Sequence, residues 1–244
     1  MKVVAITTEI TDPATMELTT ALVEGAVGAL HVPGPGHPGL RRGGTDGRME
    51  YTTISELGTE MSGRIIDVNR QVVVVSAPDQ TATINTVTLW QRLDGGGGWI
   101  QVAAPLTGRN AENGWSSDHI DGDLRSPVGV FTLTAAGGRQ PDPGTLMPYE
   151  YRPSYYQAGE PAMAAAFDYV VAIDYNRMPG YPPSDPNRPL GAAAGGGIWL
   201  HVDHGDATQG CITVTREGII AILAWLSPAS RPLIVMGDVA SLSK

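Results

Sequence analysis

The chain has 244 residues, of which 42% are hydrophobic and 17% charged, a composition typical of globular proteins that excludes a wholly disordered chain. Its formal charge of -9, with no local cluster of Lys and Arg, disfavours nucleic acid and anionic lipid as partners. The 31 glycines and 19 prolines suit turns and short strands better than helix interiors, so they favour a mainly β fold.

Residues 1–66 differ from the rest of the chain, and we expect them to form a helical and linker segment of unknown role. Asp12 followed by Pro13 is a typical N-cap and first-turn pair, which predicts a helix ending near Leu30. The Pro- and Gly-rich stretch that follows is typical of a linker or surface loop. The first residues show no apolar run of a secretory signal, and the longest apolar run, residues 218–226, is too short for a transmembrane helix.

Residues 67–244 are predicted to form one mainly β domain. Apolar and β-branched runs predict strands within residues 72–78, 83–93, 100–106, 121–133, 165–177, 198–203, 211–214 and 232–238. Apolar residues spaced by three and four predict a short helix near the C-terminus, over residues 219–226, that ends before Pro228. Residues 181–197 are too rich in Pro and Gly for regular structure and form a loop that either lines a site or is a plain surface excursion.

The chemistry is concentrated in IWLHVDHGDATQGCITV, residues 198–214, which contain the chain's only cysteine. The alternation in IWLHVD predicts a strand on which His201 points away from the face that carries Leu200. The glycines that follow permit a tight connection, so Cys211, ten positions later, is expected to return beside His201. A nearby imidazole can remove the proton of a thiol whose ordinary pKa is ~8.5 or stabilise its thiolate. Gly210 lets backbone N–H groups close around a developing oxyanion.

These residues resemble the L,D-transpeptidases of the YkuD type, whose signature is an apolar-His strand end followed by Ser/Thr-x-Gly-Cys. The matching segments here are LHV at 200–202 and TQGC at 208–211. RSPVGVFTL and IDYNR also look like segments of the family, and the likeness spans roughly residues 68–238.

The resemblance implies a YkuD-like β-sandwich or barrel with a few short helices, and a cysteine enzyme without cofactor that acts on peptidoglycan in the cell envelope. Cys211 would attack the carbonyl of the third residue of a tetrapeptide stem and expel D-alanine, with His201 as base. The side-chain amine of a neighbouring stem would then resolve the thioester into a 3-3 cross-link, and carbapenems would acylate the same thiol. The substrate pocket is expected to involve Thr208, Gln209, Tyr175, Asn176, His204 and Thr213.

The family often has arginine two positions after the cysteine, where this chain has Thr213. Arg177 and Arg216 are conceivable substitutes for binding a carboxylate, although nothing in the sequence brings either to the site.

Several other interpretations stay open at this stage. His204 is a rival base, and the ligand types in HVDHGD suggest a metal site, although no metal-binding spacing occurs and we expect none. Asp203 or a backbone carbonyl would orient His201. Water in place of the amine would make the protein an L,D-carboxypeptidase, and a thiol peptidase with another substrate is a further alternative. If Cys211 is a buried, silent residue, the protein is a non-catalytic cell-wall binding module.

Overall fold

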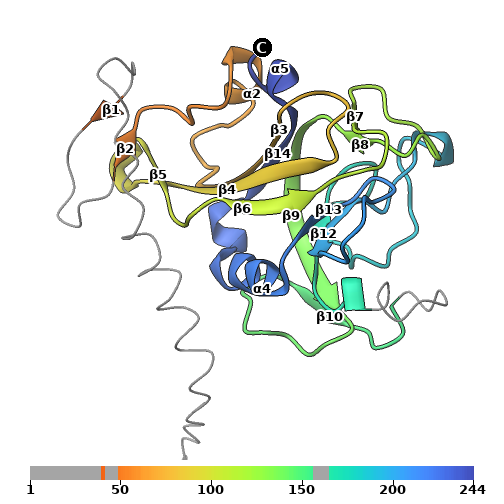
Figure 1. Ribbon diagram of the computed structural model, residues 1–244. Helices are drawn as coiled ribbons and strands as arrows, with labels where there is room; N and C mark the ends of the chain where they lie inside the picture. The colour runs from red at the N-terminus through yellow and green to blue at the C-terminus, as the bar shows by residue number, and fades with distance from the viewer. Residues whose placement is uncertain (1–39, 42–48, 156–164) are drawn as a thin grey trace, which may run out of the picture.

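The computed structural model describes residues 40–41, 49–155 and 165–244 (Figure 1). The helix predicted before Leu30 and most of the linker lie outside the described residues. The strands are β1 Leu40–Arg41, β2 Glu50–Tyr51, β3 Gln71–Ala77, β4 Ile84–Arg92, β5 Trp99–Gln101, β6 Leu106–Arg109, β7 Trp115–Ser116, β8 Ser126–Pro127, β9 Gly129–Gly138, β10 Tyr149–Tyr151, β11 Val170–Ile173, β12 Trp199–Val202, β13 Ile212–Val214 and β14 Leu233–Asp238. The helices are α2 Thr59–Ser62, α4 Arg216–Trp225 and α5 Val239–Leu242, with short 3-10 turns η2 Asp94–Gly96, η3 Ala192–Ala194 and η4 Pro228–Ser230.

The main sheet closes into a barrel. Its strands run in the order β4-β3-β14-β9-β11-β12-β13-β6, and β6 pairs with both β13 and β4, so the last strand returns to the first. Closure leaves fewer unpaired edges for a sheet of short strands. The mainly β, barrel-like prediction is confirmed.

The four valines of residues 72–75 are buried because β3 is covered on both faces. Val73 and Val75 belong to the main core inside the barrel. Val72 and Val74 belong to a second core, to which Ile54 and Met61 from the segment before β3 contribute. Residues 49–66, which the sequence assigned to the N-terminal segment, therefore pack against the barrel in part.

The helix predicted near the C-terminus is α4, and it begins three residues earlier than its apolar pattern. Thr215 caps it, since its hydroxyl accepts a hydrogen bond from the Gly218 N–H at 3.1 Å. Its apolar face joins Leu200 and Ile212 in the main core and consists of Ile219, Ile222, Leu223 and Leu226. The inner face of β12 and β13 is therefore covered by apolar side chains, and the polar side chains of these strands lie on the outer face. In the described part of the chain, no helix has the length and apolar character needed to cross a bilayer.

Candidate active site

The neighbouring strands β12 and β13 bring the histidine and the cysteine to one face of the sheet. They are parallel, with Leu200 opposite Ile212 and His201 opposite Thr213. Because side chains alternate along a strand, His201 lies on the face opposite Leu200, as predicted. Cys211 comes directly before β13, two residues from Thr213, and its side chain falls on the same outer face.

The His201 ring is fixed by a backbone carbonyl. Its Nδ1 lies 2.9 Å from the carbonyl oxygen of Val202, which can only accept, so Nδ1 carries the proton and Nε2 keeps a free lone pair. The residue is only 2% exposed and packs against Phe167, with ring centroids 5.0 Å apart. Burial lowers the pKa of the imidazole to about 4, against the opposing effect of the bond to Val202. The ring is therefore neutral at pH 7.

The Cys211 thiol lies against the backbone that leads into β12. Sγ accepts a hydrogen bond from the Trp199 N–H at 3.4 Å and donates to the Gly197 carbonyl at 3.6 Å. Burial raises the pKa of the thiol to about 11, although the Trp199 N–H acts in the opposite direction. Within the described residues, Sγ makes no hydrogen bond to His201. The resting pair is therefore a neutral thiol and a neutral imidazole rather than a thiolate and an imidazolium.

Thr208 fixes the turn that presents the cysteine. Its hydroxyl donates to the Cys211 carbonyl at 2.7 Å and accepts from the Gly210 N–H at 3.1 Å. The Gly210 carbonyl accepts from Ser126 at 2.9 Å. The Gly210 N–H is thus already engaged, whereas the Cys211 N–H has no hydrogen-bond partner among the described residues. A Cβ at Gly210 would lie 2.8 Å from Ile198 Cδ1, so a larger residue here would require the Ile198 side chain to shift.

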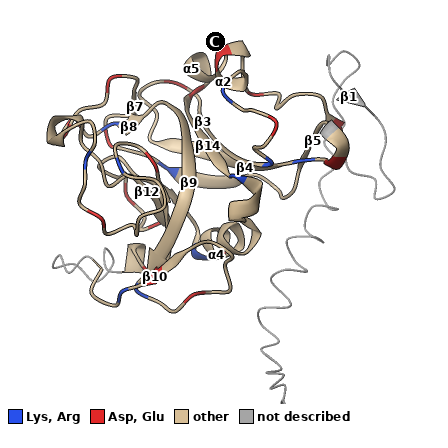
Figure 2. Cartoon of the chain, turned by 180° about the vertical axis from the view of Figure 1, so that it is seen from behind, with Lys and Arg blue, Asp and Glu red and all other residues tan. Residues whose placement is uncertain are grey.

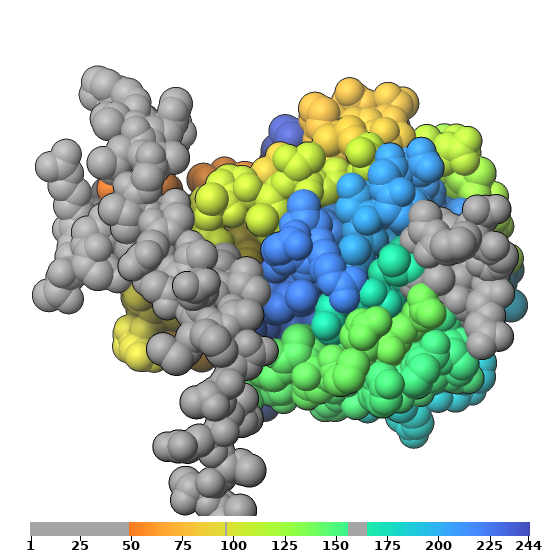
Figure 3. Space-filling model, turned by 60° about the horizontal axis from the view of Figure 1, so that its bottom comes forward, coloured from red at the N-terminus to blue at the C-terminus, as the bar shows by residue number. Residues whose placement is uncertain are grey.

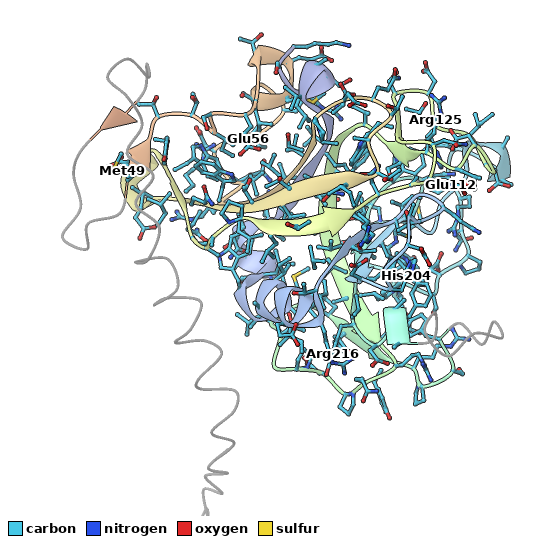
Figure 4. The ribbon with its side chains drawn as sticks, viewed as in Figure 1. Met49, Glu56, Glu112, Arg125, His204 and Arg216 are labelled. Atoms are coloured by element: carbon cyan, nitrogen blue, oxygen red, sulfur yellow. The ribbon has the colours of Figure 1, made fainter. Side chains whose placement is uncertain are left out.

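A cavity of about 660 Å³ opens on this outer face. Of the predicted site residues, it is lined by Cys211, His201, Gly210, Thr208, Gln209 and His204. The His204 ring stacks on that of His201, with centroids 5.9 Å apart and an interplanar angle of 12°. Figure 4 shows His204 on the same side of the molecule as Glu112, another residue of the cavity wall. In Figure 3 the blue surface of α4 and the loop after β12 lies between the yellow-green strands and the green segment near β10.

The structure does not bring Tyr175, Asn176 and Thr213 to the cavity. Tyr175 donates its hydroxyl to the carbonyls of His119 and Ala194 at 3.1 and 2.8 Å. Asn176 has a positive φ of 44°, which asparagine tolerates better than most residues. Its side chain is hydrogen-bonded to the backbone of Gly191, Gly195 and Leu190. Both residues therefore bind the backbone of the 181–197 loop, and neither side chain lines the cavity.

The 181–197 loop lines the site rather than forming a plain surface excursion. Gly195, Gly196 and Gly197 have φ values of 69°, 145° and 69°, a run of positive φ that side-chain-bearing residues rarely adopt. Gly196 and Gly197 line the cavity. The glycine run thus lets the backbone pass close to the thiol.

Two further residues of the wall were not singled out from the sequence. His119 is buried, with Nδ1 2.8 Å from Asp123 Oδ1, and within the described residues Nδ1 makes no hydrogen bond. Arg188 reaches the cavity from the 181–197 loop. No motif marks either residue, since His119 and Cys211 are 92 positions apart in the chain; the only sequence signal is the acid four positions after His119.

The family model of the L,D-transpeptidase catalytic domain, YkuD, matches residues 70–235. The chain belongs to the YkuD family. Comparisons with curated proteins and with solved structures gave no match. Membership in the YkuD family implies a peptidoglycan, cell-wall context for the cavity.

This YkuD domain has Thr213 in place of an arginine two positions after the cysteine. The neighbouring strand β6 carries an arginine, Arg109, opposite Thr213. Thr213 is fully buried and donates to Asp203 at 3.0 Å. Arg109 on β6 lies opposite Thr213, donates its backbone N–H to the Thr213 hydroxyl, and approaches Asp203 to 3.2 Å. Asp203 therefore serves this network rather than orienting His201.

The two arginines considered as carboxylate binders are already paired. Arg177 is buried with Asp174, and Arg216 binds Asp168 at 2.6 Å. Neither lines the cavity of the YkuD domain. Figure 2 shows basic positions scattered among the described elements rather than gathered on one face. Across residues 40–41, 49–155 and 165–244, no three metal-ligating side chains gather into a possible ion site.

Proposed function

We propose that this protein is a cysteine-dependent L,D-transpeptidase acting on peptidoglycan tetrapeptide stems at the cell envelope. One observation carries the proposal: in a YkuD-family domain, the single thiol and an imidazole with a free Nε2 line the same cavity. Cys211 is the nucleophile and His201 the general base.

The first step starts from neutral groups. As Sγ bonds to the carbonyl carbon of the third stem residue, its proton passes from the contact with Gly197 to His201 Nε2. The bond between that carbon and the nitrogen of D-alanine then breaks, and the same proton moves to the departing amine. A thioester on Cys211 remains, and the imidazole is neutral again.

The negative charge of the tetrahedral intermediate needs hydrogen-bond donors. The Cys211 N–H is the backbone donor of the turn without a partner, whereas the Gly210 N–H is held by Thr208. We therefore assign the Cys211 N–H as the main oxyanion donor. Such a donor commonly contributes about 3 kcal/mol to transition-state stabilisation.

The second step decides between two products. Attack of a neighbouring stem's side-chain amine on the thioester gives a 3-3 cross-link, whereas attack of water gives L,D-carboxypeptidase activity. In both cases His201 accepts the proton of the attacking group and returns it to Sγ. A carbapenem would acylate Cys211 by the first step and remain bound.

A non-catalytic cell-wall binding module is the second candidate. The observation that favours it is the thiol's contact with Gly197 instead of His201, together with its raised pKa of about 11. The two candidates differ in whether the thiol is required for turnover.

The test is incubation with a disaccharide-tetrapeptide and measurement of released D-alanine. The wild-type protein should release D-alanine, and Cys211→Ala should release none while still binding peptidoglycan. Release by Cys211→Ala would refute the thioester route, and no release by the wild type would favour the binding module. Mass analysis of the products separates cross-linked dimers from hydrolysed tripeptides.

A further inference from the structure

Arg188 places a guanidinium against the glycine run in the cavity wall. A Cβ at Gly196 would lie 2.2 Å from Arg188 Nε, and a Cβ at Gly197 would lie 3.4 Å from Nη2. The missing side chain of Gly196 therefore leaves the space that the guanidinium occupies, and Gly197 is in ordinary contact range of it. Arg188 is the one lysine or arginine of the described residues that lines the cavity.

One edge of this guanidinium is free to bind a ligand. Nη1 donates to the carbonyls of Asp185 and Asn187 at 3.2 and 3.0 Å, which ties the side chain to its own loop. Neither Nε nor Nη2 has a hydrogen-bond partner among the described residues, and no described carboxylate pairs with Arg188. The Nε–Nη2 edge has the fork geometry that binds a carboxylate through two parallel hydrogen bonds.

The free edge lies close to the reacting sulfur. Gly197 lies next to both groups, since its carbonyl accepts from Cys211 Sγ at 3.6 Å and a Cβ on it would lie 3.4 Å from Arg188 Nη2. In a tetrapeptide stem, the carboxylate of the terminal D-alanine follows the scissile carbonyl by one residue, a step of about 3.8 Å between Cα atoms. When Cys211 attacks the scissile carbonyl, the terminal carboxylate of the stem therefore lies at a distance that the Arg188 guanidinium can reach.

We propose that Arg188 binds the terminal carboxylate of the donor stem and so selects tetrapeptides, an inference that rests on the proposed function. A pentapeptide carries its carboxylate one residue farther from the scissile bond, outside the reach of the same fork. A stem with a C-terminal amide has no charge to pair.

The first test compares stems. Arg188→Met should raise the KM of the tetrapeptide acid roughly ten- to hundredfold, the loss expected for a charged, bidentate contact. It should leave the C-terminal amide stem, already a poor substrate, almost unchanged. Arg188→Lys keeps the charge without the fork and should recover only part of the loss. Equal KM values for the acid stem in wild type and Arg188→Met would overturn the assignment.

The second test needs no turnover. We expect the ratio of Cys211 alkylation rates with iodoacetate and iodoacetamide to fall about three- to tenfold in Arg188→Met, the effect of one unit charge at short range. The ratio cancels changes in thiol reactivity. Arg125→Met removes the same charge from the loop before β8, outside the cavity (Figure 4), and should leave the ratio nearly unchanged.

The two tests separate failure of this inference from failure of the proposed function. If no stem releases D-alanine but the ratio falls in Arg188→Met alone, the anion-binding role of Arg188 stands and the enzymatic proposal fails. If D-alanine is released and Arg188→Met has the wild-type ratio of alkylation rates, the inference about Arg188 is wrong and the proposed transpeptidase function stands. A fall in the ratio with no change in the KM of the acid stem would refute the assignment to the terminal carboxylate.

Discussion

The His201 Nδ1 lies 2.9 Å from the carbonyl oxygen of Val202, the next residue along the same strand. A strand-borne imidazole is thus oriented by its own backbone, without a carboxylate partner. The carbonyl fixes the tautomer, and burial keeps the ring neutral, since it lowers the pKa to about 4. The Nε2 lone pair is therefore available as a base at any pH above about 5.

This buried ring should make the stability of the protein depend on pH in mild acid. The folded-state pKa of His201 is lowered from 6.5 to about 4, so its contribution is fully present above pH 6.5 and is lost as the pH falls to about 4. Roughly 3 kcal/mol of unfolding free energy should disappear across this window.

Denaturant unfolding at several pH values measures this loss. His201→Gln should flatten the pH dependence between 6.5 and 4, whatever its effect on stability at pH 7. His204→Gln is the control, because it removes the histidine that stacks on His201 from the loop after β12 and leaves the buried ring in place. Burial is the larger cause of the lowered pKa of His201, so most of the pH dependence should remain in His204→Gln. An unchanged slope in His201→Gln would contradict the assignment.

The Cys211 thiol should behave as a high-pKa thiol in the absence of substrate. Because burial raises its pKa to about 11, the rate of iodoacetamide alkylation should rise about tenfold per pH unit from pH 7 to 10 without a plateau. The unfolded protein should instead level off near the ordinary thiol pKa of ~8.5. A plateau below pH 8 in the folded protein would indicate a thiolate–imidazolium pair and contradict the neutral mechanism.

Thr208 should matter through the shape of the turn. Thr208→Val removes the hydroxyl that binds both the Cys211 carbonyl and the Gly210 N–H, so we expect a loss of about 1–3 kcal/mol in unfolding free energy. D-alanine release should fall as well, because the thiol and its N–H lose their fixed position. Thr208→Ser keeps the hydroxyl and should restore most of both quantities. If Thr208→Val matched the wild type in both assays, the hydroxyl would have no such role.

Asn176 should be structural. Its side chain is buried, bonds to Gly191, Gly195 and Leu190, and its backbone has a φ of 44°. Asn176→Ala should therefore cost about 3 kcal/mol of unfolding free energy, since buried carbonyls lose their donor and alanine disfavours positive φ. Asn176→Asp keeps the shape and the acceptor but turns an oxygen toward the Gly191 and Gly195 carbonyls in a buried site, so it should cost at least as much as Asn176→Ala. A change below about 0.5 kcal/mol in Asn176→Ala, the range of an ordinary surface substitution, would show that the loop is held by other contacts.

The sequence predicted the strands well because their apolar periods are local. The run over 72–78 and the alternation over 198–203 both became strands, and the latter placed His201 opposite Leu200 correctly. Closure of the barrel was not predictable in this way. It depends on β6, four residues long, which pairs with β4 shortly before it and with β13, where Arg109 lies opposite Thr213 from a distant part of the sequence.

Of the residues that line the cavity, the sequence predicted those that are close together in the chain. Cys211, His201, Gly210, Thr208, Gln209 and His204 lie within eleven positions and line one cavity. The backbone carbonyl that orients His201 has no sequence signature, since every residue carries one. Arg188 could not be singled out from the sequence, because its place in the cavity depends on its contact with a glycine run of positive φ. Tyr175 and Asn176 were expected at the pocket because IDYNR resembles a segment of the family, whereas their side chains bind backbone groups of residues 119 and 190–195.

The mass of the protein after brief incubation with a tetrapeptide stem tests the central claim most directly. The account predicts an adduct equal to the stem without its D-alanine, attached to Cys211 as a hydroxylamine-sensitive thioester, formed by the wild type and absent in Cys211→Ala. His201→Gln should form this adduct far more slowly. D-alanine release without any thioester on Cys211, or an adduct that forms equally fast in His201→Gln, would contradict the account.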